Sequence, residues 1–164
     1  MLLSSNVSPP VRKLFATTLL LACAAAACSS EPDPAPTPAA TGCAAEKRAD
    51  AFQPGLKKIA PSGLVVSLVD ATPGPPAKGD NTWTLRLTDA TGAPVDGATV
   101  TLVPFMPDHG HGSAVKPAVT FTGSDGKYGV SRVYLAMAGY WEITVTVARG
   151  ATSDETRFGF CIDG

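Results

Sequence analysis

Short segments of alternating apolar and polar residues, separated by turn residues, constrain the fold of this chain more than any other feature. The clearest one runs from Thr82 to Thr88, where Trp83, Leu85 and Leu87 occupy every second position. A period of two places alternate side chains on opposite faces of a strand. This segment is therefore predicted to be an antiparallel strand with one buried face.

About seven segments of this kind follow one another after residue 63, with turn residues between them. The 16 glycines and 15 prolines of the chain favour turns over long helices. These features predict an all-β fold, a single immunoglobulin-like antiparallel β-sandwich of about seven strands. In the fifth segment, strict alternation places Tyr128, Val130 and Arg132 on one face. The expected strands cover residues 64–69, 82–88, 98–103, 115–122, 127–135, 139–147 and 156–162.

The N-terminal residues predict export. Arg12 and Lys13 precede an apolar run from Leu14 to Ala27. This run is too short for a membrane-spanning helix, which needs about 20 residues. A positive start, a short apolar run and small residues before a cysteine are typical of a lipoprotein signal peptide, here residues 1–27.

Two cysteines are candidates for lipid attachment. Cys28 follows Ala25–Ala27 and precedes a polar stretch, whereas Cys23 follows the apolar sequence Leu20–Ala22. We favour Cys28, because the apolar run continues up to it, and a plain secreted protein cleaved nearby is the remaining alternative. Since several acyl chains anchor a protein durably, the prediction is an exported lipoprotein, held in the membrane and facing the periplasm or the cell exterior.

Residues 28–42 alternate proline with small and acidic residues, which predicts a disordered linker. The folded domain is therefore expected to span residues 43–164. Cys43 opens this domain and Cys161 nearly closes it, and an oxidising compartment makes a disulfide the expected state of such a pair. A metal-binding or redox-active thiol pair is the alternative, although the wide spacing contains no C-x-x-C motif.

The charge balance argues against a nucleic-acid partner. The chain has a net charge of −1, and removal of the first 27 residues leaves 11 basic and 14 acidic side chains. A nucleic-acid-binding protein needs a basic patch to neutralise phosphates, and this chain has no large basic cluster.

Both histidines of the chain lie in the segment Pro104–Ser113, which we call the Met/His segment. It reads PFMPDHGHGS and is expected to be a loop between two strands. His109, His111 and Met106 offer imidazole and thioether donors. This combination favours copper, especially Cu(I), over magnesium or calcium.

Two further residues are candidates for the same site. Asp108 can orient an imidazole from the second sphere or act as an additional ligand, and Met137 can add a second sulfur if its loop lies at the same end of the sandwich. Less specific interpretations stay open. The histidines can belong to a solvated turn with adventitious metal affinity, or to a loop that folds over the sandwich end and bonds to backbone carbonyls. Both methionines can be packing residues.

An enzyme is not expected. Asp108, His109 and Ser113 include the residue types of a hydrolytic triad, but triad members normally converge from separate segments rather than from one short loop. Motifs such as G-x-S-x-G, H-E-x-x-H or a phosphate-binding loop do not occur. The alternative to metal binding is a non-metal adhesion, assembly or protein-interaction module on the same scaffold.

Several short motifs occur in a characteristic order between about residues 64 and 160. They are Leu87–Val100, Met106–Gly112, Gly126–Tyr128, Leu135, Met137–Gly139 and Trp141–Glu142. In this order they resemble the YtkA-like and FixH-like domain family. The resemblance implies an exported or membrane-tethered β-sandwich. It also points to copper and to a copper-handling partner protein, because relatives occur beside copper-handling or oxidase-assembly proteins.

Overall fold

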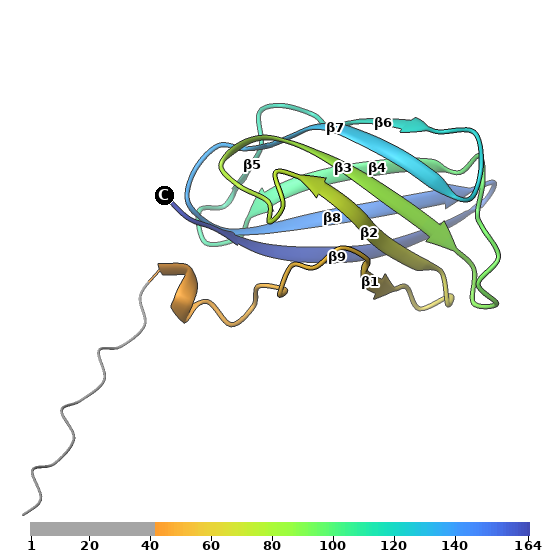
Figure 1. The fold of residues 1–164 in the computed structure, drawn as a ribbon, viewed down its shortest axis with the longest axis horizontal. Helices are drawn as coiled ribbons and strands as arrows, with labels where there is room; N and C mark the ends of the chain where they lie inside the picture. Colours follow the sequence, from red (N-terminus) through yellow and green to blue (C-terminus); the bar gives the residue numbers. More distant parts are fainter. Residues whose placement is uncertain (1–41) are drawn as a thin grey trace, which may run out of the picture. The chain divides into compact units, whose positions relative to one another are not determined.

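The computed structural model describes residues 42–164, which form one short 3-10 turn, η1 (Gly42–Ala45), and nine strands (Figure 1). The predicted signal peptide, the candidate lipidation sites Cys23 and Cys28, and the predicted linker up to residue 41 lie outside the described residues. The strands are β1 (Leu56–Ile59), β2 (Val65–Thr72), β3 (Gly79–Thr88), β4 (Thr99–Met106), β5 (His111–Gly112), β6 (Ala118–Phe121), β7 (Lys127–Leu135), β8 (Gly139–Arg149) and β9 (Thr152–Ile162).

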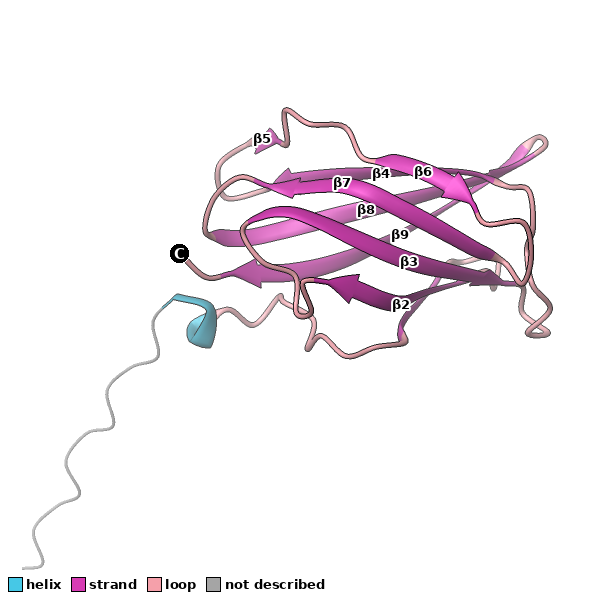
Figure 2. Cartoon of the chain, turned by 45° about the horizontal axis from the view of Figure 1, so that its top comes forward, coloured by secondary structure: helices cyan, strands magenta, loops and turns pink. Residues whose placement is uncertain are grey.

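Two antiparallel sheets pack against each other (Figure 2). One has the strand order β1-β2-β3-β7-β6 and the other has the order β5-β4-β8-β9. Their apolar faces enclose a single core, as expected for an immunoglobulin-like sandwich. The predicted fold class is confirmed. Within residues 42–164, no helix is long and apolar enough to cross a membrane.

Two of the strands were not predicted, β1 and β5. They contain four and two residues respectively, so they carry too few alternations to be recognised from sequence. Both lie at sheet edges. The short β5 matters for the site, because it contains one of the two histidines.

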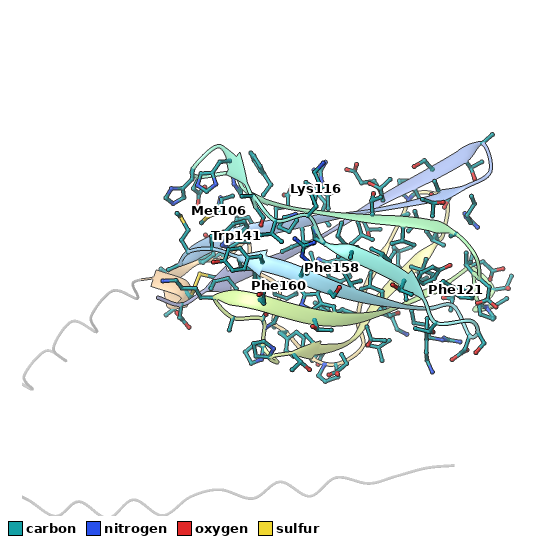
Figure 3. The ribbon with its side chains drawn as sticks, turned by 90° about the horizontal axis from the view of Figure 1, so that it is seen from above. Met106, Lys116, Phe121, Trp141, Phe158 and Phe160 are labelled. Atoms are coloured by element: carbon teal, nitrogen blue, oxygen red, sulfur yellow. A yellow bond between two sulfur atoms is a disulfide. The ribbon has the colours of Figure 1, made fainter. Side chains whose placement is uncertain are left out.

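Aromatic side chains join the two sheets across the core. Trp83 on β3 and Phe160 on β9 meet edge to face, with ring centroids 5.7 Å apart. Trp83, Leu85 and Leu87 are buried, as the alternation predicted. Trp141 on β8 is completely buried at the end of the sandwich where the Met/His segment lies (Figure 3).

Strand β4 continues three residues beyond its predicted end, so the first part of the Met/His segment is strand rather than loop. Exposed and buried residues alternate strictly along β4, and this alternation places Pro104 and Met106 on the buried face. Pro104 was expected to begin a loop. Proline cannot donate a ladder hydrogen bond. A proline is tolerated where a strand has a largely free edge, and β4 is paired on that side only by the short β5.

A bulge in β7 changes which residues face the core. Arg132 has a φ of 60° and is exposed, and the pairing of β7 with β3 shifts at this point. The prediction that Arg132 shares a face with Tyr128 and Val130 is therefore wrong. Val133 and Leu135 continue the buried face instead.

The turn that precedes β4 is held by a tyrosine. The hydroxyl of Tyr128 donates to the carbonyl of Val95 (3.0 Å) and accepts from the amide of Ala98 (2.9 Å). The carboxylate of Asp96 accepts from the amide of Gly126 (2.6 Å). These bonds give a structural role to the family motifs at residues 87–100 and 126–128. The Met/His segment takes no part in them.

Candidate metal-binding loop

The two histidines sit on a tight hairpin between β4 and β5. The amides of His109 and Gly110 both donate to the carbonyl of Met106, at 3.2 and 2.9 Å. Gly110 has a φ of 68°, a left-handed conformation that glycine adopts without strain. The amide of Ser113 donates to the carbonyl of Pro104 and closes the hairpin. The backbone therefore fixes both histidines relative to the end of β4.

The two imidazole rings lie close enough to share one metal ion. Their centroids are 5.8 Å apart and their planes are inclined by 60°. A nitrogen–metal bond of about 2 Å puts an ion roughly 3.2 Å from each ring centre, so two rings on one ion stand roughly 5 Å apart at a tetrahedral angle and roughly 6.4 Å apart when linear. Both side chains are exposed. The pair fits an ion that enters from solvent.

A backbone contact leaves one nitrogen of His111 free for a metal. Its Nδ1 lies 3.2 Å from the carbonyl oxygen of Gly112. Because a carbonyl oxygen only accepts, this hydrogen bond needs the proton on Nδ1, and the lone pair is then on Nε2. Metal-binding histidines are commonly oriented by such a bond from the other ring nitrogen.

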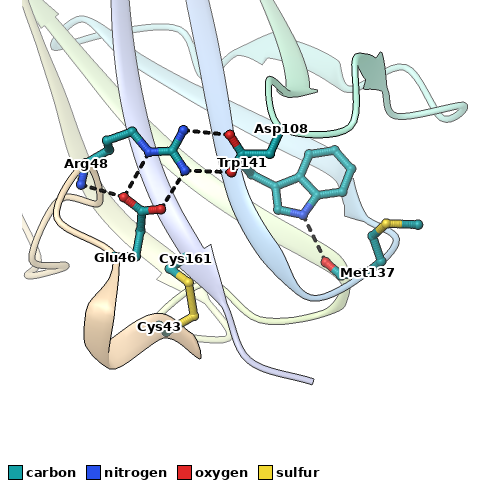
Figure 4. The surroundings of a disulfide bond; sticks show 7 residues. All are labelled: Cys43, Glu46, Arg48, Asp108, Met137, Trp141 and Cys161. Carbon is teal, nitrogen blue, oxygen red and sulfur yellow. Dashed lines mark hydrogen bonds and ion pairs between the residues drawn. A yellow bond between two sulfur atoms is a disulfide. The ribbon is translucent and has the colours of Figure 1, made fainter. Parts of the chain in front are cut away.

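The ring of Trp141 packs against the ring of His111. The rings of His111 and Trp141 meet edge to face, with centroids 6.5 Å apart and planes at 80°. The indole Nε1 donates to the carbonyl of Met137 (2.9 Å), which fixes the orientation of the buried ring (Figure 4). His111 therefore rests on a rigid aromatic platform rather than on a mobile loop.

Met106 points into the sandwich. It is directly opposite His111 in the β4–β5 pair, and opposite residues share a face of a sheet. Its side chain has no exposed surface, and its methyl group lies against Gly139. Met137 is 37% exposed, in the loop before β8. The structure thus brings Met106 beneath His111, but the two histidines are the donors that are open to solvent.

Asp108 binds an arginine that lies 60 positions before it in the chain. Its two carboxylate oxygens accept from the two terminal nitrogens of Arg48, at 2.7 and 2.6 Å (Figure 4). Arg48 also donates to both oxygens of Glu46, at 2.9 and 2.6 Å, and its guanidinium lies 4.3 Å from the ring centre of Tyr140. Hydrogen bonding to Arg48 lowers the pKa of Asp108. In residues 42–164, no three side chains of the His, Cys, Asp and Glu types are arranged to hold a metal ion.

Comparison with known proteins identifies the family. The YtkA-like family model matches residues 61–146, which is just over half of the chain. The chain belongs to the YtkA-like family. The FixH-like part of the predicted resemblance stays a prediction. No curated protein matches this YtkA-like chain.

Among solved structures, one similar chain is described as the crystal structure of the Lin-41 filamin domain. It has 19% sequence identity and a TM-score of 0.37, and the match covers 53% of the YtkA-like chain and 79% of the filamin chain. At that score the likeness supports no conclusion about function.

The disulfide lies at the same end of the YtkA-like domain as the histidines. Cys43 and Cys161 are joined, at a sequence separation of 118. A cleft of about 380 Å³ connects them to the loop, since its lining includes both cysteines, Asp108 and Gly139. The predicted disulfide is therefore present, and it fixes the start of the YtkA-like domain beside the Met/His segment.

Arg48 and Glu46 are the site residues that sequence reasoning missed. Lys47-Arg48 is too short to form a basic cluster, and nothing in the local pattern links it to Asp108, which is 60 positions after Arg48. The available signal was indirect. A disulfide between Cys43 and Cys161 brings the residues after Cys43 to the end of the domain where its last strand finishes.

The low pKa of Glu46 makes this ion-pair network resistant to acid. Hydrogen bonds from Arg48 lower the pKa of Glu46 from 4.5 to about 2. A carboxylate whose pKa falls on folding stabilises the native state above its unfolded pKa, so this contribution declines as the pH falls from 4.5 and is lost below about 2. We expect the side-chain carboxyl carbon of Glu46 to titrate in NMR spectra with a midpoint near 2.

The variant Arg48→Ala provides the control for this titration. Without the guanidinium, the midpoint of Glu46 should return towards 4.5. A wild-type midpoint already near 4.5 would mean that Arg48 does not hold Glu46 in solution.

Proposed function

We propose that this YtkA-like protein binds copper through His109 and His111 and delivers it to a copper-handling partner in the cell envelope. The observation that carries the proposal is the placement of the two rings, 5.8 Å apart and open to solvent on a hydrogen-bonded hairpin. The hydrogen bond to His111 Nδ1 adds support, because it directs the lone pair to Nε2. The family resemblance points to the same metal. The proposed role is binding and transfer rather than catalysis.

The donor set favours Cu(I) over zinc. Imidazole suits both metals, but zinc sites in proteins are almost always four-coordinate, with three or four protein ligands. Cu(I) forms stable complexes with two donors, and two histidines are what this hairpin presents. The thioether of Met106 lies beneath His111 and is a soft donor that favours Cu(I) if the side chain turns outward.

We further propose that the protein is an exported lipoprotein, anchored through Cys28 or, alternatively, Cys23. The disulfide between Cys43 and Cys161 supports export, because disulfides persist in oxidising compartments. Mass spectrometry of the mature N-terminus tests this directly. A diacylglyceryl-modified cysteine at position 28 is the expected result, and an unmodified N-terminus would contradict both anchoring sites.

Copper binding is tested by titrating the full chain, purified in detergent, with Cu(I) against a competing chelator. Thiol reductants are left out, so that the disulfide stays intact. We expect the double variant His109→Ala/His111→Ala to bind at least about tenfold more weakly, since even groups outside the first ligand sphere typically account for ten- to hundredfold in metal affinity. The variant Lys116→Ala is a matched control, because Lys116 is exposed a few residues after His111 and offers no soft donor (Figure 3).

Two outcomes would overturn the copper proposal. One is a double variant that keeps the wild-type affinity. The other is a wild-type protein that binds Cu(I) no more tightly than a free His-Gly-His peptide, because the hairpin and Trp141 would then contribute nothing.

A protein-interaction module is the second candidate function. The observation in its favour is the outer face of β4, where Val103 is 56% exposed and Phe105 is 38% exposed. Both side chains lie on one face of the strand, and a contiguous exposed apolar surface is a feature of protein contact sites. If copper binding fails, a pull-down from envelope extract with the wild type and with Val103→Ser/Phe105→Ser tests this candidate, since the variant should lose the partner.

A further inference from the structure

Asp108 carries the carboxylate nearest to the two histidines in the sequence, and this carboxylate is bound to Arg48. Asp108 immediately precedes His109 in the hairpin turn that the amides of His109 and Gly110 close on the carbonyl of Met106, so its carboxylate and both imidazoles start from the same short turn. Yet both oxygens of Asp108 are directed to Arg48. An aspartate in this position would otherwise be available as a third donor beside His109 and His111.

Several contacts hold Arg48 in place. Its backbone amide and its side chain both bond to Glu46, and its guanidinium stacks on the ring of Tyr140. Bidentate arginine–carboxylate pairs are more directional than ordinary surface ion pairs, and a network of them is worth more than an isolated pair. The guanidinium is therefore positioned before any metal arrives.

The segment that carries Arg48 is itself fixed at both ends. Upstream, Cys43 is bonded to Cys161, and the amide of Glu46 donates to the carbonyl of Cys43. Downstream, Asp50 bonds to both backbone groups of Gly159, at the free edge of β9. Arg48 thus acts on the loop from a rigid support.

The identity of the donors determines which metal a site prefers. Carboxylate oxygen is a hard donor that suits zinc and other divalent ions, and a third protein ligand is what a two-histidine site lacks for zinc. Removing that oxygen from reach costs a two-coordinate Cu(I) site nothing. Sequestration of Asp108 therefore selects against zinc without weakening Cu(I) binding.

We propose that Arg48 is a specificity-determining positioning residue, which keeps the histidine pair selective for Cu(I) by holding the Asp108 carboxylate away from it. This role of Arg48 rests on the proposed copper function, because selectivity for Cu(I) presupposes that the protein binds copper. The juxtaposition of Arg48, Asp108 and the histidines also predicts a change in Zn²⁺ affinity, which can be measured independently of copper binding.

The test compares Zn²⁺ and Cu(I) affinities of the full chain in detergent, again without thiol reductants. The variant Arg48→Ala should bind Zn²⁺ about tenfold more tightly than the wild type, the change that a group around a metal site typically produces. Its Cu(I) affinity should change by less than about threefold, since no Cu(I) donor is altered. Arg48→Lys keeps a cation for Asp108 but loses the bidentate contact, so its Zn²⁺ affinity should lie between those of the wild type and Arg48→Ala.

Two double variants show which carboxylate causes the gain in Zn²⁺ affinity. Arg48→Ala/Asp108→Asn should return Zn²⁺ binding to the wild-type level, whereas Arg48→Ala/Glu46→Gln should keep the gain. An Arg48→Ala protein with unchanged or weaker Zn²⁺ binding would overturn the proposal, and so would a gain that survives the loss of Asp108. A purely structural role for Arg48 predicts weaker binding of both metals, with a lower unfolding midpoint.

The outcomes for the two proposals are distinguishable. If the wild type fails to bind Cu(I), the copper function fails, but a zinc gain in Arg48→Ala that depends on Asp108 still establishes that Arg48 withholds the carboxylate. If the wild type binds Cu(I) and Arg48→Ala shows no zinc gain, the copper function stands and the role of Arg48 is refuted.

Discussion

Replacing Cys43 and Cys161 together with serine is expected to lower the free energy of unfolding by about 4–5 kcal/mol. The bond closes a loop over 118 positions, and in the chain-entropy model a longer loop in the unfolded state gives a larger stabilisation. The loss should appear in urea denaturation as a lower midpoint. Because the sandwich core does not depend on the sulfur atoms, the folded sheets should remain.

Reduction of the wild-type protein with a thiol reagent is the control for the serine variant, because it removes the same constraint without changing the sequence. Both samples should unfold at similar urea concentrations. A variant with the midpoint of the oxidised wild type would contradict the prediction, because the bond would then not stabilise the protein by constraining its unfolded chain.

The variant Trp141→Ala is expected to lose about 3–5 kcal/mol of stability. The indole is completely buried, so its removal leaves a large cavity, and the carbonyl of Met137 loses its donor. The same change removes the platform under His111. We therefore expect weaker Cu(I) binding even at temperatures where the variant is fully folded, as judged by circular dichroism.

Val103→Thr is the matched control on the neighbouring strand. Val103 is 56% exposed, and threonine keeps the branched shape that suits a strand, so the change in stability should stay within about 0.5 kcal/mol. If Trp141→Ala also unfolds within that margin of the wild type, the core at this end is not packed as described.

The predictable part of the fold is the part governed by alternation. Trp83, Leu85 and Leu87 face the core because a strand has a period of two and one of its faces is buried. The order of the motifs was sufficient to indicate the family. These inferences need only local pattern and composition.

The mistakes arise where a local rule has an exception that depends on tertiary structure. Pro104 was assigned to a loop, but β4 accommodates it because little pairs with that edge. Arg132 was placed on the buried face, but its left-handed backbone inserts an extra residue and reverses the alternation. Both exceptions depend on what the partner strand does, which a single sequence does not contain.

The candidate site was also predictable only in part. His109 and His111 were identified because they are the only histidines of the chain and stand two residues apart. The buried position of Met106 follows from the register of β4 against β5, and the pairing of Asp108 with Arg48 joins positions 60 residues apart. Contacts of this kind depend on how segments meet in space, and no spacing rule predicts them.

The location of the C-terminus has a practical consequence for handling the protein. Gly164 and Asp108 line one cleft, so a dye, affinity tag or solid support attached after Gly164 lies beside the turn that carries the histidines. Strand β8 has 11 residues and runs from that end to the turn at Gly150, roughly 35 Å away. A label inserted at the Gly150 turn leaves the loop free, and comparing the two attachment points shows whether a neighbouring surface hinders metal exchange.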